Sequence, residues 1–424
     1  MSITRKQLPE LKSNIDSLIN KLTTYNENGK PPLVAPAICI GVSDDKQTLY
    51  LNSKGVRSLE DPESTIDNDS IFSLFSCTKT MTAMAILILY EQGKLSLDLP
   101  CYKYLPEIEL IGIVDPGTVN KQGQYTKLPR KPKVPITIRH LLLHLSGFSY
   151  GFINAEYHKL ITKGEKMDPI NPPREFFSNK KTPLVHEPGS DFMYGHSYEW
   201  LGFIVQAISG KPLGEFLKEY VFDPIGMTSC TFHLLDESKL VRVHYRNTDD
   251  SIKLMKRFPI HPNPILDLGG QGCLGTVGDY LKLLRVWLNY GYSPDSGKRI
   301  LNESTVKWAI ENHMPGHVNV EFQGMSHNED ESYVKDGWSL TGNAINMNDL
   351  KSGRPKGCLY WSGLGNLYYW LDFHNKVCGL YAGQLLPFLD EYAFTGYQEF
   401  ESYVYQAINK SKREQEQQNP TGKL

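Results

Sequence analysis

The chain has no long hydrophobic run. Its longest apolar stretch, from Ala83 to Tyr90, is much shorter than the roughly 20 residues that a helix needs to cross a bilayer. The opening residues, MSITRKQLPELKS, contain no apolar segment of signal-peptide length. We therefore expect a cytoplasmic protein with no membrane partner. Peroxisomal import is the alternative, because the final Gly-Lys-Leu differs from the Ser-Lys-Leu address only in its first residue.

The chain also lacks a dominant charge and paired cysteines. Its 45 Lys and Arg residues nearly balance 47 Asp and Glu residues, and the formal net charge of -2 gives no field that would attract nucleic acid. The seven cysteines occur singly, without the Cys-x-x-Cys pairs that are typical of zinc and redox sites. We expect reduced thiols, no nucleic-acid partner, and no metal or organic cofactor.

What the chain does have is strand and helix patterns at both ends. Residues Leu8 to Leu22 show helical spacing, and each end of the chain predicts a pair of short strands around a polar turn. The strand pairs are Ala37 to Val42 with Thr48 to Asn52, and Leu367 to Phe373 with Lys376 to Ala382. An amphipathic stretch from Asp390 to Ile408 follows the second pair.

The middle of the chain is mostly helical in pattern. Helical spacing occurs at Thr80 to Glu91, Thr137 to Leu145, Tyr198 to Ile208 and Asp279 to Tyr290. At 424 residues the chain exceeds the usual size of one hydrophobic core. We therefore expect an α+β protein: a sheet domain from residues 1–74 and 335–412, a mainly helical domain from 75–334, and a flexible tail from 413–424.

The candidate nucleophile is Ser76, in the motif Ser76-Cys77-Thr78-Lys79. The motif follows a largely apolar run and opens an apolar, and hence buried, helix. Residues three apart share a helix face, so the Lys79 amine can approach the Ser76 hydroxyl. Burial should lower the pKa of Lys79, which would let a neutral amine take the serine proton. A capped core helix with one snorkelling lysine is the alternative.

The Ser-x-x-Lys spacing has little specificity by itself, since it recurs at four other serines. Ser43 falls in a predicted hairpin turn, Ser178 in a loop and Ser332 in an acidic polar stretch, while Ser304 reads as a helix N-cap. Only Ser76 precedes a helix that is almost entirely apolar. Its setting, and not the spacing, singles it out.

Six further segments carry a family resemblance. In chain order they are EQGKLSLDLPCYKYLPE, ITIRHLLLHLSGF, EPGSDFMYGHSYEWLG, FDPIGM, GGQGCLGTVGDY and WSGLGNLYYWLD. With the Ser76 motif they resemble the serine β-lactamase and penicillin-binding-protein superfamily, in particular the class C-like branch with family VIII carboxylesterases and fungal lovastatin-type acyltransferases. The resemblance covers nearly the whole chain. It implies a β-lactamase/transpeptidase-like fold, an antiparallel sheet flanked by helices with an inserted mainly helical domain.

The resemblance also implies residue roles. Ser76 would be the nucleophile, Lys79 its activating partner, and Tyr194, in the place of the family's Tyr-x-Asn tyrosine, would relay the proton. A phenol has an ordinary pKa of about 10, which can fall beside a cationic lysine. The backbone N–H groups of Ser76 and Leu364 would form an oxyanion hole. Gly363 would let the substrate backbone pass closely.

Two departures from the family pattern bear on the substrate. Trp361 replaces the cationic lysine that typical β-lactamases direct at a substrate carboxylate, so the pocket loses a charge and gains a large apolar wall. His196 replaces the Asn of Tyr-x-Asn, a donor to the acyl-side amide, or else tunes Lys79. We therefore expect a small-molecule substrate, a neutral acyl ester or thioester, with water or an alcohol as acceptor.

The sequence thus predicts a serine hydrolase or acyltransferase, carboxylesterase-like, that forms an acyl-enzyme at Ser76. A β-lactamase or a D-amino-acid peptidase or amidase of the same fold is the alternative, and an inactive binding or scaffold protein is the alternative of another class. A nucleophile elbow at Ser197 is disfavoured because the motif ends in Glu199. His140 and His144, four residues apart, lack the adjacent Glu of a metalloprotease helix.

Overall fold

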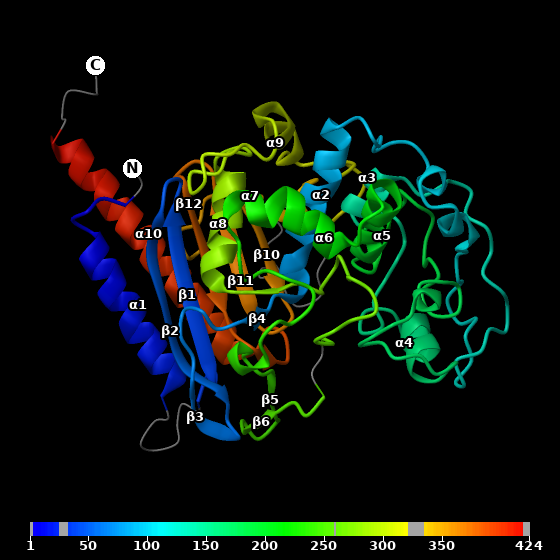
Figure 1. The fold of residues 1–424 in the computed structure, drawn as a ribbon, viewed down its shortest axis with the longest axis horizontal. Coiled ribbons are helices and arrows are strands. Elements are labelled where there is room, and N and C mark those ends of the chain that lie inside the picture. The colour runs from blue at the N-terminus through cyan, green and yellow to red at the C-terminus, as the bar shows by residue number, and fades with distance from the viewer. Residues whose placement is uncertain (1–2, 25–32, 258–259, 321–334, 419–424) are drawn as a thin grey trace.

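The computed structural model describes residues 3–24, 33–257, 260–320 and 335–418 (Figure 1). The helices are α1 (Leu8–Thr23), α2 (Lys79–Glu91), α3 (Ile138–Leu142), α4 (Ala155–Thr162), α5 (Ser197–Ser209), α6 (Leu213–Leu217), α7 (Asp223–Ile225), α8 (Val277–Leu288), α9 (Glu303–Ala309) and α10 (Glu391–Gln418). The strands are β1 (Ala37–Asp44), β2 (Thr48–Ser58), β3 (Asp61–Thr65), β4 (Phe72–Ser73), β5 (His244–Arg246), β6 (Ile252–Leu254), β7 (Leu274–Gly275), β8 (Gly337–Trp338), β9 (Ala344–Ile345), β10 (Leu359–Gly363), β11 (Leu367–Asp372), β12 (Val377–Ala382) and β13 (Leu385–Leu386).

An eight-stranded antiparallel sheet joins the two ends of the chain. Its strand order is β3-β2-β1-β12-β11-β10-β9-β8. The N-terminal strand β1 lies directly beside the C-terminal strand β12, with Ile40 opposite Tyr381. β10 pairs with β11 so that Gly363 lies opposite Leu367. Residues distant in sequence therefore meet at the middle of the sheet.

Both faces of this sheet are covered. On β1, Ile38, Ile40 and Val42 pack with α1 and α10, whereas Ala37 and Cys39 join the core on the other face. This alternation follows from the two-residue period of a strand. Figure 1 shows α1 and α10 side by side against the sheet, and α8 packs against β1 and β12 on the opposite face. The sheet is consequently the centre of a three-layer arrangement.

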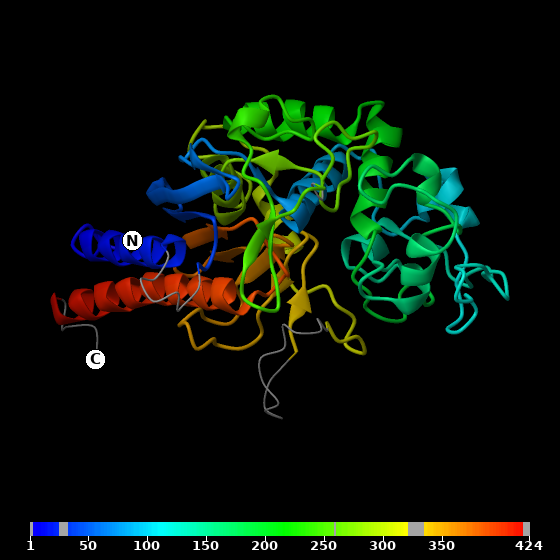
Figure 2. The ribbon, with the colours of Figure 1, turned by 90° about the horizontal axis from the view of Figure 1, so that it is seen from below.

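The remaining helices gather away from the α1–α10 layer, as Figure 2 shows from a second direction. α2 packs against α5 and α6, and α5 also packs against α3. Every residue of α2 from Lys79 to Leu89 is buried, as expected for a helix that is apolar all round. The start of α2, next to β10, is thus enclosed between the sheet and the helical region.

The structure confirms the α+β fold and most element positions. α1, both predicted strand pairs and the four central helices are present within a few residues of their predicted bounds. α3 ends at Leu142, before the predicted end at Leu145, and His144 then has a φ of 54° that is incompatible with helix. α10 continues to Gln418, so residues 413–418 are helical, and the flexible tail from 413 stays a prediction. Residues 419–424 lie outside the described residues.

The predicted division into a sheet domain and a helical domain stays a prediction. α8 belongs by sequence to the segment 75–334, yet it packs on β1, β2, β11 and β12. That segment therefore contributes to the sheet layers as well as to the helical region.

Two of the other Ser-x-x-Lys serines lie in different places from those predicted. Ser304 is in the first turn of α9, whose N-cap is Asn302. Ser43 is the buried penultimate residue of β1 and not a turn residue. Ser332 lies outside the described residues.

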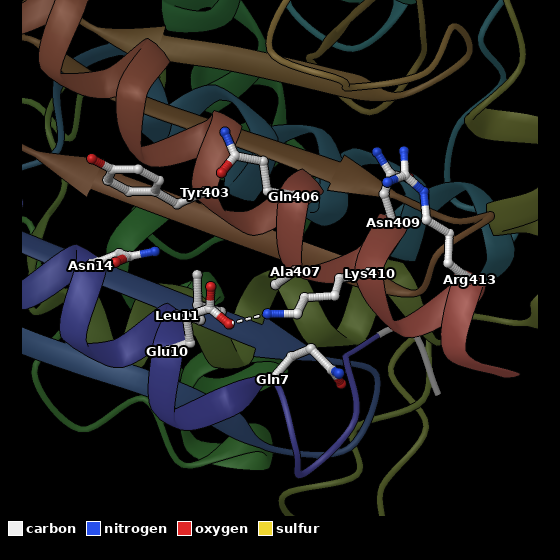
Figure 3. Close-up of a pocket in the computed structure, with 10 residues that line it drawn as sticks. All are labelled: Gln7, Glu10, Leu11, Asn14, Tyr403, Gln406, Ala407, Asn409, Lys410 and Arg413. Atoms are coloured by element: carbon white, nitrogen blue, oxygen red, sulfur yellow. Dashed lines mark hydrogen bonds and ion pairs between the residues drawn. The ribbon is translucent and has the colours of Figure 1, made fainter.

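A groove of about 430 Å³ separates α1 from α10 near their exposed ends (Figure 3). Lys410 reaches across it to Glu10, with 2.5 Å between the amine and the carboxylate. None of the residues that line the groove belongs to the Ser76 motif or to the segments around it. The groove lies beyond the sheet from Ser76 and plays no part in the site described below.

None of the helices in the described part of the chain combines the length and apolar character needed to cross a bilayer.

Candidate active site

Ser76 lies in a short 3₁₀ turn, Phe75–Thr78, that leads directly into α2. The turn follows β4, which pairs with β7, and the Leu74 N–H donates to the Cys273 carbonyl at 3.0 Å. Phe75 has a φ of 46°, a left-handed conformation that is strained for a bulky residue. This sharp change of direction between strand and helix leaves Ser76 half-buried among buried neighbours.

Residues on both sides of β7 hold the other side of the turn. The Tyr280 hydroxyl donates to the Cys77 carbonyl at 3.0 Å, and the Cys273 N–H donates to the Thr78 hydroxyl at 3.1 Å. Since α8, which carries Tyr280, also packs on the sheet, the position of Ser76 is tied to the main core.

The structure brings together the three residues predicted to carry the chemistry. The Ser76 Oγ lies 3.1 Å from the Lys79 Nζ and 2.8 Å from the Tyr194 hydroxyl. The Trp361 indole, from β10, donates to the Tyr194 hydroxyl at 3.2 Å. Because an indole N–H can only donate, the Tyr194 hydroxyl accepts from Trp361 and its own proton points to Ser76.

Lys79 has three acceptors within reach. Besides Ser76, its Nζ lies 2.8 Å from the Gly270 carbonyl oxygen and 3.4 Å from the Tyr150 hydroxyl. A neutral amine has two N–H donors and one lone pair, so it can donate to Gly270 and Tyr150 and accept from the Ser76 hydroxyl. An ammonium can donate to all three. The same three oxygen atoms thus accommodate the Lys79 amine both before and after it takes the Ser76 proton.

Burial sets the charge state of Lys79. Removal from water lowers the pKa of Lys79 to about 8, although Glu199 and Cys77 oppose the shift. The rings of Tyr194, Tyr150 and Tyr198 surround the amine, with Nζ to centroid distances of 4.6, 5.5 and 5.7 Å, and favour the ammonium. The amine is therefore balanced between its two states near neutral pH, as a general base requires.

The expectation that the pKa of Tyr194 falls is wrong. Burial raises the pKa of Tyr194 above its ordinary value, and the hydrogen bonds with Ser76 and Trp361 only partly oppose this. The nearby Lys79 does not outweigh the loss of water. Tyr194 is consequently a neutral phenol, suited to giving a proton, while Lys79 is the group suited to taking one.

The end of β10 lies against the Ser76 turn. A Cβ on Gly363 would be 2.6 Å from the Leu74 carbonyl oxygen and 3.3 Å from the Cys77 sulfur, so only glycine fits. Glycine is thus required here by the protein's own backbone, a reason that the sequence did not reveal. Leu364, which is half-buried, follows Gly363 directly. That the backbone N–H groups of Ser76 and Leu364 form an oxyanion hole stays a prediction.

Trp361 and His196, the two predicted substrate-binding departures, both point into the protein. Trp361 is 3% exposed, and its ring centroid lies 4.6 Å from that of Trp338. His196 is 7% exposed and is packed among aromatic rings, with Tyr150 nearest at 4.5 Å between centroids. Its Nδ1 lies 3.8 Å from the Glu199 carboxylate. This placement favours the second role considered for His196, an influence on the Lys79 environment.

The residues of the two disfavoured alternatives, the nucleophile elbow and the metal site, each have contacts that account for them structurally. Ser197 is fully buried, and its hydroxyl lies 2.8 Å from that of Ser146. The His140 ring accepts from the Thr137 N–H and completes a capping box at the start of α3. His144 is enclosed by aromatic rings, and burial holds its pKa well below the ordinary value. Across the described ranges, no three His, Cys, Asp or Glu side chains are grouped as metal ligands would be.

Sequence reasoning missed Tyr150 and Glu199. The Tyr150 hydroxyl donates to the Glu199 carboxylate at 3.2 Å, and this buried pair lies behind Lys79. Tyr150 follows the LLLHLSGF segment in a stretch with no periodicity. Glu199 did carry a signal, since an acidic side chain among the apolar residues of α5 has to find a partner.

Comparisons with known proteins identify the family and the fold. A family model described as Beta-lactamase matches residues 31–399. Monacolin J acid methylbutanoyltransferase of Aspergillus terreus is 23% identical over 409 residues, 92% of this chain and 96% of that protein. Lovastatin esterase of Penicillium rubens is 28% identical over 352 residues, 80% of this chain and 86% of that protein. The unliganded simvastatin synthase (LovD) of Aspergillus terreus has the same fold, with a TM-score of 0.77, 22% identity, and 95% and 98% of the two chains covered. The resemblance and the fold expected from the sequence are confirmed.

Proposed function

This chain belongs to the beta-lactamase family, and on that premise we propose that it is a serine esterase or acyltransferase with Ser76 as its nucleophile. The observation that supports this most directly is the position of the Ser76 Oγ between the Lys79 amine at 3.1 Å and the Tyr194 hydroxyl at 2.8 Å. One neighbour is suited to accept a proton and the other to give one. A serine in such a position can be activated for attack.

In the proposed reaction the Ser76 Oγ attacks the carbonyl carbon of the acyl donor while its proton passes to Lys79. The charge that develops on the carbonyl oxygen is held by the N–H groups of Ser76 and Leu364. Tyr194 protonates the leaving oxygen or sulfur and is reprotonated from Lys79, so that the alcohol or thiol leaves neutral. Water or a second alcohol then attacks the acyl-enzyme and gives its proton to Lys79. The bond between the acyl carbon and the Ser76 Oγ breaks, Lys79 returns the proton to the Ser76 Oγ at 3.1 Å, and the acyl group leaves as a carboxylic acid or a new ester.

The substrate that we propose is a small molecule, a neutral acyl ester or thioester. The family's lysine for a substrate carboxylate is replaced by Trp361, whose indole is used to hold Tyr194. A carboxylated β-lactam would therefore bind without a cationic partner at this position. The names of the two relatives, a methylbutanoyltransferase and an esterase, cover transfer of an acyl group to an acceptor and ester hydrolysis.

A cytoplasmic location is part of this proposal and rests on the sequence alone. The C-terminal Gly-Lys-Leu, on which the peroxisomal alternative depends, lies outside the described residues.

The experiment that tests the nucleophile is peptide mass spectrometry after brief exposure to a p-nitrophenyl ester or a fluorophosphonate. Wild type is compared with Ser76→Ala, Ser197→Ala and Ser178→Ala. We expect an adduct on the Ser76 peptide that disappears only in Ser76→Ala. Ser178→Ala is the matched control, because it removes a serine with the same spacing to a buried lysine.

Other outcomes separate the alternatives. An adduct on Ser197, or turnover that survives in Ser76→Ala, would overturn the mechanism. No adduct and no turnover would favour the binding or scaffold protein. An acyl-enzyme that forms faster with a carboxylated β-lactam or a D-amino-acid amide than with neutral esters would favour the β-lactamase or peptidase alternative.

A further inference from the structure

A buried carboxylate lies behind the catalytic lysine. Glu199, in the first turn of α5, is completely buried. Its Oε1 accepts from the Tyr150 hydroxyl at 3.2 Å, and its Oε2 has no hydrogen-bond partner among the described residues. A buried charge with so few partners is costly to keep. It calls for an explanation beyond packing.

Tyr150 connects this carboxylate to Lys79. The Tyr150 hydroxyl has one proton, which it donates to Glu199, so it must accept from the Lys79 Nζ at 3.4 Å. Gly270 lies next to both side chains: its carbonyl oxygen is 2.8 Å from the Lys79 Nζ, and a Cβ built on it would be 2.4 Å from the Glu199 Oε1. The chain therefore brings the acid close to the lysine from two sides.

We infer that Glu199 is a positioning residue which, through Tyr150, keeps the Lys79 amine a strong enough base to take the Ser76 proton. This inference rests on the proposed function. Burial alone works against Lys79 as a base, because a desolvated amine holds a proton poorly. A nearby negative charge stabilises the ammonium that forms when Ser76 is activated. Glu199 supplies that charge without touching the substrate.

The other groups around the pair are largely neutral. The titratable neighbours are Tyr150 from the loop after α3, Tyr157 from α4, Tyr194 and His196 from the segment before α5, Tyr198 from α5, Cys77 before α2, and His144 after α3. Burial raises the pKa of the four tyrosines and of Cys77, and lowers that of His144. Burial would raise the pKa of Glu199 as well, but His196 and Lys79 outweigh it and the pKa is lowered.

The test is the pH dependence of kcat/KM for a p-nitrophenyl ester in wild type, Glu199→Gln, Glu199→Asp and Glu156→Gln. We expect Glu199→Gln to move the acid limb to lower pH, with the activity ratio of variant to wild type rising about tenfold below the limb for each unit of displacement. Its plateau should fall, since a weaker base takes the Ser76 proton more slowly. Glu199→Asp keeps the charge and should leave the limb near its wild-type position.

Glu156→Gln is the matched control. Glu156 is also a buried carboxylate, but it accepts from the Gly117 and Val119 N–H groups on α4's side of the molecule. Neutralising it should leave the limb in place. A purely structural role for Glu199 would lower the activity of Glu199→Gln equally at every pH. A limb in Glu199→Gln that superimposes on the wild-type limb overturns the inference.

A second variant covers the case in which Glu199→Gln does not fold, as judged by circular dichroism. Tyr150→Phe then takes its place, because it removes the hydroxyl between Lys79 and Glu199 and should also move the acid limb to lower pH. An unmoved limb in Tyr150→Phe overturns the inference. Failure of the proposed function is distinct, since it appears as activity or labelling that persists in Ser76→Ala.

Discussion

Two turns of this chain share the Ser-x-x-Lys spacing and the same local backbone geometry. The Lys79 N–H donates to the Ser76 carbonyl, and the Lys181 N–H donates to the Ser178 carbonyl at 3.1 Å. Both lysine side chains are buried, and burial lowers the pKa of both. The two sites therefore share their sequence spacing, their backbone hydrogen bond and a buried lysine.

They differ in what the side chains meet. The Ser178 hydroxyl donates to the Glu175 carbonyl at 2.7 Å, and the Lys181 amine donates to the Leu160 carbonyl. A backbone carbonyl can accept a hydrogen bond but cannot take or give a proton. At the other turn the Ser76 hydroxyl meets Lys79 and Tyr194, which can do both. The comparison shows that the spacing supplies one helical turn, and that tertiary partners decide whether the turn has chemistry.

The largest difference in activity between the two turns is expected when the lysine of each is replaced. Lys79→Met should lower kcat/KM by about two to four orders of magnitude, because it removes the proton acceptor for Ser76. Lys181→Met should change activity less than about twofold, since this side chain donates to a backbone carbonyl, that of Leu160. Steady-state hydrolysis of a p-nitrophenyl ester measures both.

Equal losses in the two variants would contradict the distinction between the turns. Thermal unfolding of each variant is the control, because loss of a buried side chain can lower activity simply by unfolding the chain.

The local part of this site could be predicted from the sequence, because it depends on short-range geometry. Ser76 and Lys79 are joined by a single turn, and the apolar character of α2 predicts its burial. The strands at both chain ends could likewise be predicted from their apolar patterns and from the polar turns between them. The placement of Tyr194, 118 residues from Ser76, needed the family resemblance.

The rest of the site could not be predicted, because it depends on packing between elements that are far apart in the sequence. Tyr150 lies 71 residues from Lys79 and 49 from Glu199, and nothing in their local sequence specifies that their hydroxyl, amine and carboxylate meet. The raised pKa of Tyr194 was missed for the same reason. Whether burial or the neighbouring lysine dominates is decided by how completely α5 and β10 exclude water, which a motif does not encode.

A change of pH is expected to have an intermediate effect on kcat/KM. With the pKa of Lys79 lowered to about 8 by burial, about a tenth of the amine is neutral at pH 7, so kcat/KM should rise roughly tenfold from neutral pH to its plateau. The pKa of Tyr194 is raised, so deprotonation of this phenol should not reduce activity below its ordinary range. Initial rates across the pH range, corrected with Ser76→Ala for uncatalysed hydrolysis, provide the measurement.

The same pKa gives an independent readout in stability. Between pH 8 and the ordinary value of 10.5 the unfolded chain binds the Lys79 proton and the folded chain does not. Stability should therefore rise with pH in this window, by up to about 3 kcal/mol relative to Lys79→Met. A difference in unfolding free energy that stays flat from pH 8 to 10.5 would show that Lys79 titrates elsewhere.

The smallest effect is expected at the indole that holds Tyr194. Trp361→Phe removes the 3.2 Å hydrogen bond to the Tyr194 hydroxyl but keeps an aromatic ring in the buried position. Loss of one such bond costs about 0.5–1.5 kcal/mol, or roughly a two- to tenfold decrease in kcat. Trp338→Phe is the matched control, because the Trp338 indole donates at 3.0 Å to the Leu142 carbonyl, which also accepts from the Tyr198 hydroxyl at 2.8 Å. If Trp361 only fills space, the two variants will lose activity alike; if it orients the Tyr194 proton toward Ser76, kcat will fall in Trp361→Phe alone.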